Sequence, residues 1–315
     1  MTHAQQFEDL RPWLFAIAYR LVGSVADAED AVQDTWLRWA GADDEPVTLK
    51  PYLATIITRI CLDLLRSARH RRETYVGPEL PEPLPTGPSG LDRFSDPERA
   101  AELSESVSVA SLLLLERLSP LERAAYVLHD VFAFGFDDIA TVLERSAPAC
   151  RQLAARARVH LAEGRRRYDA DAAQHRELAR RFFAALRDGA IEPLQALLAD
   201  DVAAINDSGG EAGGAGGTFP RVRMARILAG AVTPLLTAGA RIEQREFNGS
   251  PGAVLIDADG DVLGTWTLEI AAGAVQTIHS VTNPRKLAHL GPVGDLHAMR
   301  RAAQKVRRRE GESSR

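Results

Sequence analysis

Arginine side chains are concentrated on one predicted helix, residues 147–158, where their spacing is suited to nucleic-acid contacts. Arg151, Arg156 and Arg158 follow Pro148 in this segment, and proline is favoured in the first turn of a helix because its missing N–H is not needed there. Guanidinium groups bind phosphates and base edges in a major groove. An ordinary helix pair with solvated arginines shows the same pattern, so both interpretations stay open for these residues alone.

A second basic segment, residues 50–72, follows an acidic one. Residues 24–46 carry seven acidic residues against Arg38 alone, whereas residues 50–72 carry six basic residues against Asp63 alone. The acidic segment is suited to a basic protein partner and the basic segment to phosphate groups. A solvated helix face is the commoner explanation of either run taken by itself.

Helical periodicity positions these charges. Apolar residues at three- and four-residue spacing predict one helix that ends at Gly23, a second over about 25–39 capped by Ser24, and a third over about 50–72.

A helix pair is predicted further along the chain. Ile139, Leu143 and Leu153 fill the angle between helices at 136–143 and 147–158. The intervening residues 144–146 form the turn, and the two helices make a helix-turn-helix.

Composition changes twice along the chain. Between residues 76 and 97 lie six prolines and three glycines, which predict a semi-rigid linker. Beyond residue 169, a helix over 174–188 precedes alternating apolar and polar segments, which predict an α+β domain with a curved antiparallel sheet. The predicted strands are 202–205, 240–247, 253–256, 262–270 and 275–281.

Together these segments resemble the extracytoplasmic-function (ECF) family of sigma-70 RNA polymerase sigma factors. Residues 18–23 and 27–38 look like regions 2.1–2.2, and residues 51–72 look like regions 2.3–2.4. Residues 118–123, followed by 135–158, resemble region 4. The resemblance implies a factor that directs transcription initiation at a specific promoter set, as in a stress response.

The resemblance also implies which residues make contacts. Contacts to the β′ clamp helices of core RNA polymerase are expected from Asp27, Glu29, Asp30, Gln33, Trp36 and Leu37. Contacts to the −10 element are expected from the 40–50 loop and from Arg59, Asp63, Arg66, Arg69, Arg71 and Arg72. Contacts to the −35 element are expected from Ala147, Cys150, Arg151, Arg156 and Arg158. Trp39 and Tyr52 are possible base-stacking partners, although aromatics at helical spacing more often belong to the core.

The C-terminal half resembles a SnoaL-like domain of the NTF2 cone fold, which the SigJ-like subgroup of this family carries behind region 4. The subgroup's Asn-Pro-x-Lys-Leu motif is intact at 283–287. Its linker motif Trp-Leu-Pro-Glu-Pro occurs at 79–83 with Glu79 in place of Trp, and its Asp-Gly-Gly-Gly motif is altered at 206–214. Regulatory contacts between domains are expected from Leu80, Pro81, Glu82, Pro83, Asn283, Pro284, Lys286 and Leu287.

The predicted fold class is therefore multidomain. Two all-α sigma domains, a region 2 helical bundle and a region 4 helix-turn-helix, are joined to an α+β cone (SnoaL/NTF2-like). The expected boundaries are 1–75 for region 2, 76–97 for the linker, 98–168 for region 4, 170–290 for the SnoaL-like domain and 291–315 for a basic tail. The tail is expected to be disordered.

Relatives of the cone fold include enzymes, which need a base near an oxyanion donor. The candidate bases are Asp207, Asp257 and His279, but no tyrosine follows Tyr168 to serve as a phenolic donor. Two cysteines, Cys61 and Cys150, lack zinc-site spacing and are expected to be buried. We therefore expect no catalysis, cofactor or metal, and a domain that regulates activity in cis; a ligand-sensing pocket stays open.

Net charge is −5 for the 315 residues, which argues against a uniformly basic, histone-like chain. Its distribution is uneven, because residues 50–72, 145–168 and 299–315 are each strongly basic within an acidic remainder. This pattern is typical of a protein that binds DNA well only together with polymerase.

The sequence offers no signal peptide and no apolar run long enough to span a membrane, so a cytoplasmic protein, monomeric when free, is expected. The alternative is a helix-turn-helix DNA-binding regulator that never contacts polymerase, with a ligand-sensing or vestigial enzymatic SnoaL-like domain. The acidic helix over residues 27–36 favours the sigma factor, because a simple repressor would not need it.

Overall fold

The computed structural model describes residues 2–42, 46–72, 78–86, 108–162, 172–210 and 216–313. The chain forms two compact units, each of which takes two separate stretches of the sequence. Unit 1 contains Met1–Tyr75 and Pro88–Arg166, and unit 2 contains Val76–Gly87 and Arg167–Arg315. Residues 76–87 of the predicted linker therefore belong to the C-terminal unit.

The N-terminal half of unit 1 is a bundle of three helices, α1 (His3–Val22), α2 (Val25–Ala40) and α3 (Leu49–Arg72). Gly23 ends α1 in the left-handed conformation, at φ 72°, and the Ser24 hydroxyl accepts the N–H of Asp27 to cap α2. The predicted helix end at Gly23 and the predicted N-cap at Ser24 are both confirmed. Tyr19, Leu53 and Ile57 are fully buried in the bundle.

The remainder of unit 1 is also helical. It comprises α5 (Val109–Glu116), α6 (Pro120–Tyr126), a π-helical turn (Val127–Val131), α7 (Phe136–Leu143) and α8 (Ala147–Ala162). Ser119 and Glu122 form a capping box that starts α6. Glu144 ends α7 in the left-handed conformation, at φ 55°. The predicted helix-turn-helix is confirmed as α7 and α8.

Unit 2 is built on a seven-stranded sheet with the order β1-β4-β5-β6-β7-β2-β3. The strands are β1 (Pro85–Thr86), β2 (Leu198–Asp207), β3 (Gly217–Pro220), β4 (Arg241–Phe247), β5 (Ser250–Ile256), β6 (Val262–Ala271) and β7 (Ala274–Val281). β2 and β7 pair in parallel, so the prediction of an antiparallel sheet is wrong at this pair. A helix and four strands separate β2 from β7, and such a long connection permits parallel pairing.

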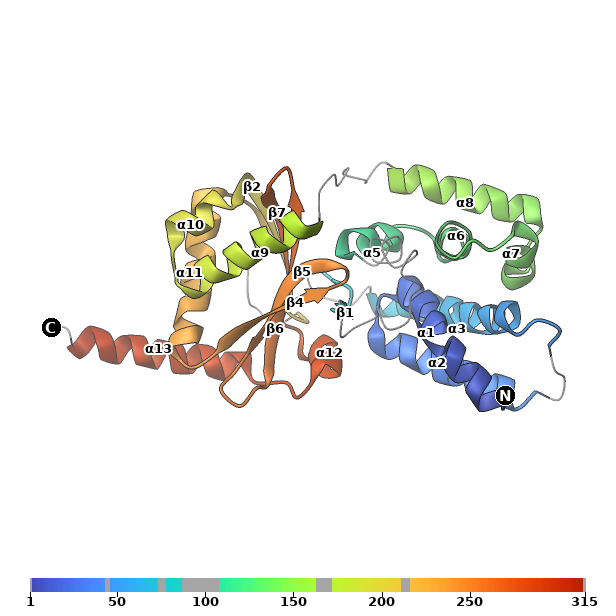
Figure 1. Ribbon diagram of the computed structural model, residues 1–315, viewed down its shortest axis with the longest axis horizontal. Helices are drawn as coiled ribbons and strands as arrows, with labels where there is room; N and C mark the ends of the chain where they lie inside the picture. Colours follow the sequence, from blue (N-terminus) through green and yellow to red (C-terminus); the bar gives the residue numbers. More distant parts are fainter. Residues whose placement is uncertain are drawn as a thin grey trace. The chain divides into compact units, whose positions relative to one another are not determined.

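Three helices, α9 (Ala172–Arg187), α10 (Ile191–Ala196) and α11 (Arg221–Thr237), cover one face of the sheet (Figure 1). Phe182, Phe183 and Met224 from these helices pack with Leu255 and Leu268 from the strands. The sheet is followed by α12 (Pro284–Leu287) and a 3₁₀ turn (Ala288–Leu290). Helices and sheet together form the predicted α+β domain.

The proline-rich linker contributes a strand to this sheet. β1 pairs antiparallel with β4, with Pro85 opposite Phe247 and Thr86 opposite Glu246. Proline is tolerated here because β1 lies at the edge of the sheet, where one row of backbone donors is not needed. The prediction of a semi-rigid connecting segment is therefore wrong for this part of the linker.

The basic tail ends in a helix, α13 (Leu296–Ser313), and is not disordered over these residues. Leu296, Met299 and Ala303 pack against the core of unit 2, and Ala303 is buried. Apolar residues at this spacing form one face of a helix, and packing of that face explains why the segment is ordered. The high charge of the segment led to the prediction of disorder. In the described part of the chain, no helix is long and apolar enough to cross a membrane.

We expect Phe183→Ala to lower the free energy of unfolding of unit 2 by about 3–5 kcal/mol, because Phe183 is fully buried in the core. Denaturant unfolding followed by circular dichroism measures the change. Val222→Ala, which truncates an exposed side chain on α11, is the control. A loss below about 1 kcal/mol for Phe183→Ala would contradict the packing described above.

Candidate functional site

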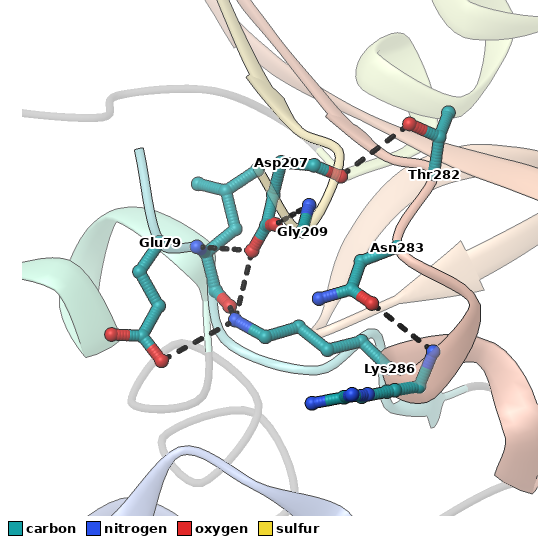
Figure 2. A network of polar contacts seen from close by, with 8 residues as sticks. Glu79, Asp207, Gly209, Thr282, Asn283 and Lys286 are labelled. Atoms are coloured by element: carbon teal, nitrogen blue, oxygen red, sulfur yellow. Dashed lines mark hydrogen bonds and ion pairs between the residues drawn. The ribbon is translucent and has the colours of Figure 1, made fainter. Parts of the chain in front are cut away.

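A buried polar network holds the linker on the C-terminal domain (Figure 2). The carboxylate of Asp207, at the end of β2, accepts the Leu80 N–H at 2.9 Å and lies 2.8 Å from the Lys286 Nζ. Lys286 also donates to the Leu80 carbonyl and forms an ion pair with Glu79 at 3.7 Å. Asp207 is fully buried, so both polar groups of the Leu80 backbone are satisfied by one buried acid–base pair.

The Asn-Pro-x-Lys-Leu motif positions this lysine. The Asn283 side chain accepts the Arg285 N–H and caps α12, while Pro284 occupies its first turn. The N–H groups of Thr282 and Asn283 donate to the Asp207 carbonyl at 2.8 and 3.1 Å, which fixes α12 beside β2. Lys286 therefore points from α12 to the linker.

Gly209, in the altered 206–214 motif, contacts both Asp207 and Asn283. Its N–H donates to the Asp207 carboxylate at 3.1 Å, and its φ of +72° lies in the left-handed region. A Cβ at this position would come within 2.9 Å of the Asn283 side chain. One glycine of the motif is thus required by its conformation and by its close contact with Asn283.

A second set of hydrogen bonds holds the linker at Leu84. The Leu84 N–H donates to Asn248 Oδ1 at 3.1 Å, and the Asn248 N–H donates to the Leu84 carbonyl at 2.8 Å. Asn248 lies at φ 55° in the turn between β4 and β5. His289 contacts the Pro83 carbonyl at 2.8 Å and lies 3.9 Å from Glu82.

The predicted interdomain residues therefore meet in one site. Leu80 and Leu287 are each 1% exposed, and Pro81, Glu82, Pro83 and Asn283 are buried. Glu79 stands where the subgroup has Trp and supplies a second carboxylate to Lys286 instead of an apolar anchor. Asp207 and Asn248, which complete the site, were not predicted as linker-binding residues. The sequence singled out Asp207 only as a candidate base and as part of the altered 206–214 motif, and it gave no prediction for Asn248.

The predicted polymerase-binding residues share one face of α2. Glu29, Asp30, Gln33 and Leu37 are exposed at helical spacing, and Asp27 and Trp36 are half-buried beside them. A groove of about 260 Å³ between α1 and α2 borders this face, with Phe7, Arg11, Glu29, Val32, Gln33 and Trp36 among its lining residues. Glu29 is paired with Arg11 at its edge. This face combines negative charge with a partly apolar groove.

Trp39 belongs to the core of the helical bundle. It is 4% exposed and stacks on Phe7 with 6.1 Å between ring centroids. The core interpretation is therefore correct for Trp39, and its ring is not available to stack on a base. Tyr52 is half-buried on α3.

The basic helix α3 contacts α7 of the helix-turn-helix through Arg59. The Arg59 guanidinium donates to the carbonyls of Val142 and Thr141, at 3.2 and 3.0 Å, and lies 3.1 Å from Glu144. These groups form the C-terminal end of α7, which favours a cation. Arg66 is paired with Asp63 at 2.9 Å on the exposed side of α3. The side chains of Arg69, Arg71 and Arg72 lie outside the described residues, as do residues 43–45 of the loop.

Further contacts join the two halves of unit 1. Arg123 donates to the Leu21 carbonyl at 2.6 Å, and Trp13 contacts the rings of Phe132 and Phe134, each at 6.0 Å between centroids. The Arg20 guanidinium lies 5.4 Å from the Phe132 ring centroid, and burial lowers the pKa of Arg20 to about 10. Arg20 remains charged at neutral pH, which suits this cation–π contact. We call this packing the closed arrangement of unit 1.

The candidate −35 residues on α8 differ in their exposure. Arg151 is exposed and lies 5.8 Å from the Phe136 ring centroid, and Ala147 is half-buried. Arg156 is paired with Glu122 at 3.0 Å and Arg158 with Asp130 at 2.7 Å. Direct contact of Cys150 with DNA is contradicted, because its side chain is fully buried against the helix pair.

The ion pairs of α8 shift the pKa values of Glu122 and Arg158. Burial acts to raise the pKa of Glu122, but hydrogen bonds from Ser119 and the Arg156 charge outweigh it and hold this pKa below its ordinary value. The hydrogen bond to Asp130 raises the pKa of Arg158. Both acids therefore hold arginines of α8 in ion pairs.

The candidate catalytic residues have structural partners. Asp257 accepts the N–H groups of Asp259 and Asp261, at 3.0 and 2.9 Å, and closes a turn. Burial lowers the pKa of His279, which lies 3.4 Å from Glu269; strand alternation places it on the face opposite the core residue Ile278. In the residues that the structure describes, no three His, Cys, Asp or Glu side chains are grouped to hold a metal ion.

Comparison with known proteins assigns the chain to a family. The model for Sigma-70 region 2 matches residues 6–71, and the model for Sigma-70, region 4 matches residues 110–161. The probable ECF RNA polymerase sigma factor SigI of Mycobacterium tuberculosis is 33% identical over 286 residues, which cover 88% of this chain and 92% of SigI. The chain belongs to the ECF sigma-70 family.

Two further matches extend the likeness of this ECF sigma factor to its C-terminal domain. The ECF RNA polymerase sigma factor SigJ of M. tuberculosis is 46% identical over 209 residues, which cover 66% of this chain and 65% of SigJ. The crystal structure of M. tuberculosis SigJ matches with a TM-score of 0.68 and 35% identity, over 91% of this chain and 98% of that chain. The sigma domains and the fused α+β domain are therefore shared with SigJ.

We expect Lys286→Met in this ECF sigma factor to release the linker, because it leaves the buried Asp207 carboxylate without its cation. Breaking a buried pair by removing one partner costs about 3–5 kcal/mol. Limited proteolysis with Glu-C, which cleaves after acidic residues, should cut after Glu79 at least 10-fold faster in the variant.

Lys305→Met, which removes an exposed lysine of the same unit, is the matched control. The double variant Asp207→Asn/Lys286→Met should regain part of the protection, because no buried charge is then unpaired. Equal cleavage rates in Lys286→Met, Lys305→Met and the unmodified chain would contradict the assigned role of the pair.

Proposed function

We propose that this ECF sigma factor binds core RNA polymerase through the exposed face of α2 and recruits it to a two-part promoter. In this proposal α3 and the preceding loop contact the −10 element, and α8 enters the major groove at the −35 element. The C-terminal domain regulates these events in cis by holding the linker. The capture of Leu80 by Asp207 and Lys286 carries the regulatory part of the proposal.

The polymerase contact rests on charge and exposure. The α2 face of Glu29, Asp30, Gln33 and Leu37 is available in the described structure and combines two carboxylates with an apolar side chain that is 59% exposed. Such a face fits a basic helical partner with apolar side chains, as expected for the β′ clamp helices. The family to which the chain belongs supports this partner.

Promoter binding requires the closed arrangement to open. The −10 and −35 elements are by definition about 25 base pairs apart, on the order of 80 Å of duplex. Arg59 on α3 lies 3.0 Å from the Thr141 carbonyl on α7, so the two DNA-binding helices cannot reach both elements in this arrangement. Arg59, Arg156 and Arg158 must also exchange their protein partners for DNA. The closed arrangement is therefore a state that precedes promoter binding.

The linker determines how far region 2 can move from unit 2. Residues 73–108 connect α3 with α5, and fully extended they could span about 120 Å. Capture of residues 79–86 by unit 2 leaves six residues, 73–78, between α3 and the captured segment, which is about 20 Å of extended chain. Holding or releasing this segment therefore changes the reach of region 2 without any separate inhibitor protein.

A catalytic role for the C-terminal domain is not part of this proposal. Asp207 and Asp257 are engaged by backbone N–H groups, and Asp207 also by Lys286. His279 is buried beside Glu269, on the face of the sheet opposite the main core. The interior of the domain is packed with apolar side chains, which suits a docking module.

We expect Asp30→Lys to weaken binding of core RNA polymerase at least 10-fold, because it places a cation on the acidic face of α2. Binding of the purified full chain to immobilised core polymerase, measured by biolayer interferometry, gives the change in Kd. Glu192→Lys, the same charge reversal at an exposed position on α10, should change Kd less than 2-fold. Failure of the unmodified chain to bind core polymerase would favour the alternative of a helix-turn-helix regulator that acts without polymerase.

A further inference from the structure

A strongly basic helix that the proposed function does not use is α13. Residues 300–309 contain six basic residues, Arg300, Arg301, Lys305, Arg307, Arg308 and Arg309, and no acidic one. Its C-terminal part extends past α11 and away from the rest of unit 2 (Figure 1). The C-terminal part of this cationic helix therefore extends beyond the domain that carries it.

The apolar face of α13 is already occupied. Leu296, Met299 and Ala303 pack against the core of unit 2. Arg301 and Lys305 are exposed on the same helix. Arg301 lies 3.6 Å from Asp295, but both side chains are more than 60% exposed, and such pairs contribute little. Among the side chains described on α13, up to residue 305, the outward side thus offers positive charge without an apolar patch.

We propose that α13 binds the phosphate backbone of duplex DNA next to the −35 element. Arginine and lysine on one free helix match the charge of the duplex, which carries a negative charge about every 1.7 Å. Nine residues, 163–171, separate α8 from α9 and span at most about 30 Å. The domain that carries α13 therefore stays within reach of the duplex that α8 binds, so this location rests on the proposed function of α8.

Two other polyanionic partners fit the structure less well. A helix that binds a membrane surface inserts an apolar face into it, and the apolar face of α13 is buried in its own domain. An acidic protein would need a docking surface with an apolar centre, which the described part of α13 does not present. Binding to the backbone of duplex DNA requires only positive charge on the helix, which α13 carries.

The test variant is Arg301→Gln/Lys305→Gln/Arg308→Gln in the full chain. The matched control is Arg187→Gln/Arg226→Gln/Arg241→Gln, which removes three exposed arginines from α9, α11 and β4. Binding to a fluorescein-labelled 40-base-pair duplex is followed by fluorescence anisotropy over a series of KCl concentrations. Thermal unfolding of each variant verifies that the domain is folded.

We expect the α13 variant to bind the duplex at least about 10-fold more weakly at 0.1 M KCl, with a salt slope of log K reduced by about 2–3, because each phosphate contact contributes about 0.9 to the slope. The control should change affinity less than 3-fold. Equal losses in both variants, or an unchanged salt slope, would overturn the proposal.

Vesicles of phosphatidylcholine and phosphatidylglycerol form the second arm of the experiment. Loss of vesicle binding without loss of DNA binding in the α13 variant would overturn the proposal in favour of a lipid surface. Core polymerase capture through α2 is measured separately. Its failure would contradict the proposed function and leave the DNA affinity of α13 intact.

Discussion

The buried pair of Asp207 and Lys286 is the interaction on which the organisation of this protein depends. It binds the backbone of Leu80, which lies 127 residues before Asp207 in the sequence, and satisfies both the N–H and the carbonyl of this residue. A buried ion pair often adds little net stability compared with apolar residues of the same size, but an unpaired buried charge is strongly unfavourable. The pair is thus well suited to define one docked position of the linker rather than many weak ones.

Because the linker docks on unit 2, the chain passes between the two units more than once. The chain runs from region 2 into the sheet of unit 2, returns to region 4 and enters unit 2 again. Within unit 1, Arg59 caps α7 and Arg123 reaches the Leu21 carbonyl, so Arg59, which is proposed to bind DNA, is used for a protein contact. In the proposed function, linker capture keeps region 2 close to unit 2, and the closed arrangement occupies the side chains proposed to bind DNA. Under that proposal, these two effects favour the same inactive state.

Much of the helical half could be predicted from the sequence, because its signals are local. Gly23, Ser24 and Pro148 mark helix boundaries through their own conformational preferences, and the three sigma segments occur in the family order. The intact 283–287 motif likewise indicates the site of linker docking. The physical causes of the helix boundaries lie within a few residues, so one sequence is sufficient to find them, whereas the 283–287 motif indicates linker docking only through the family resemblance.

The features that the sequence did not reveal depend on distant partners. Parallel pairing of β2 with β7 requires knowledge of what separates them, and the strand at Pro85–Thr86 exists only because β4 offers an edge. Engagement of Arg59 follows from packing between helices. The order of α13 comes from three apolar residues in a segment dominated by arginine, and α11 lay in a stretch where no prediction was made.

Amide hydrogen exchange at Leu80 and Leu84 tests the central claim most directly. Both N–H groups donate to side chains of the C-terminal domain, Leu80 to Asp207 and Leu84 to Asn248. Exchange of the full chain, read by mass spectrometry with fragmentation to single amides, should be at least 100-fold slower at both positions than in a peptide of residues 76–90. Exchange at the rate of the free peptide would show that the linker is not held and would contradict the account.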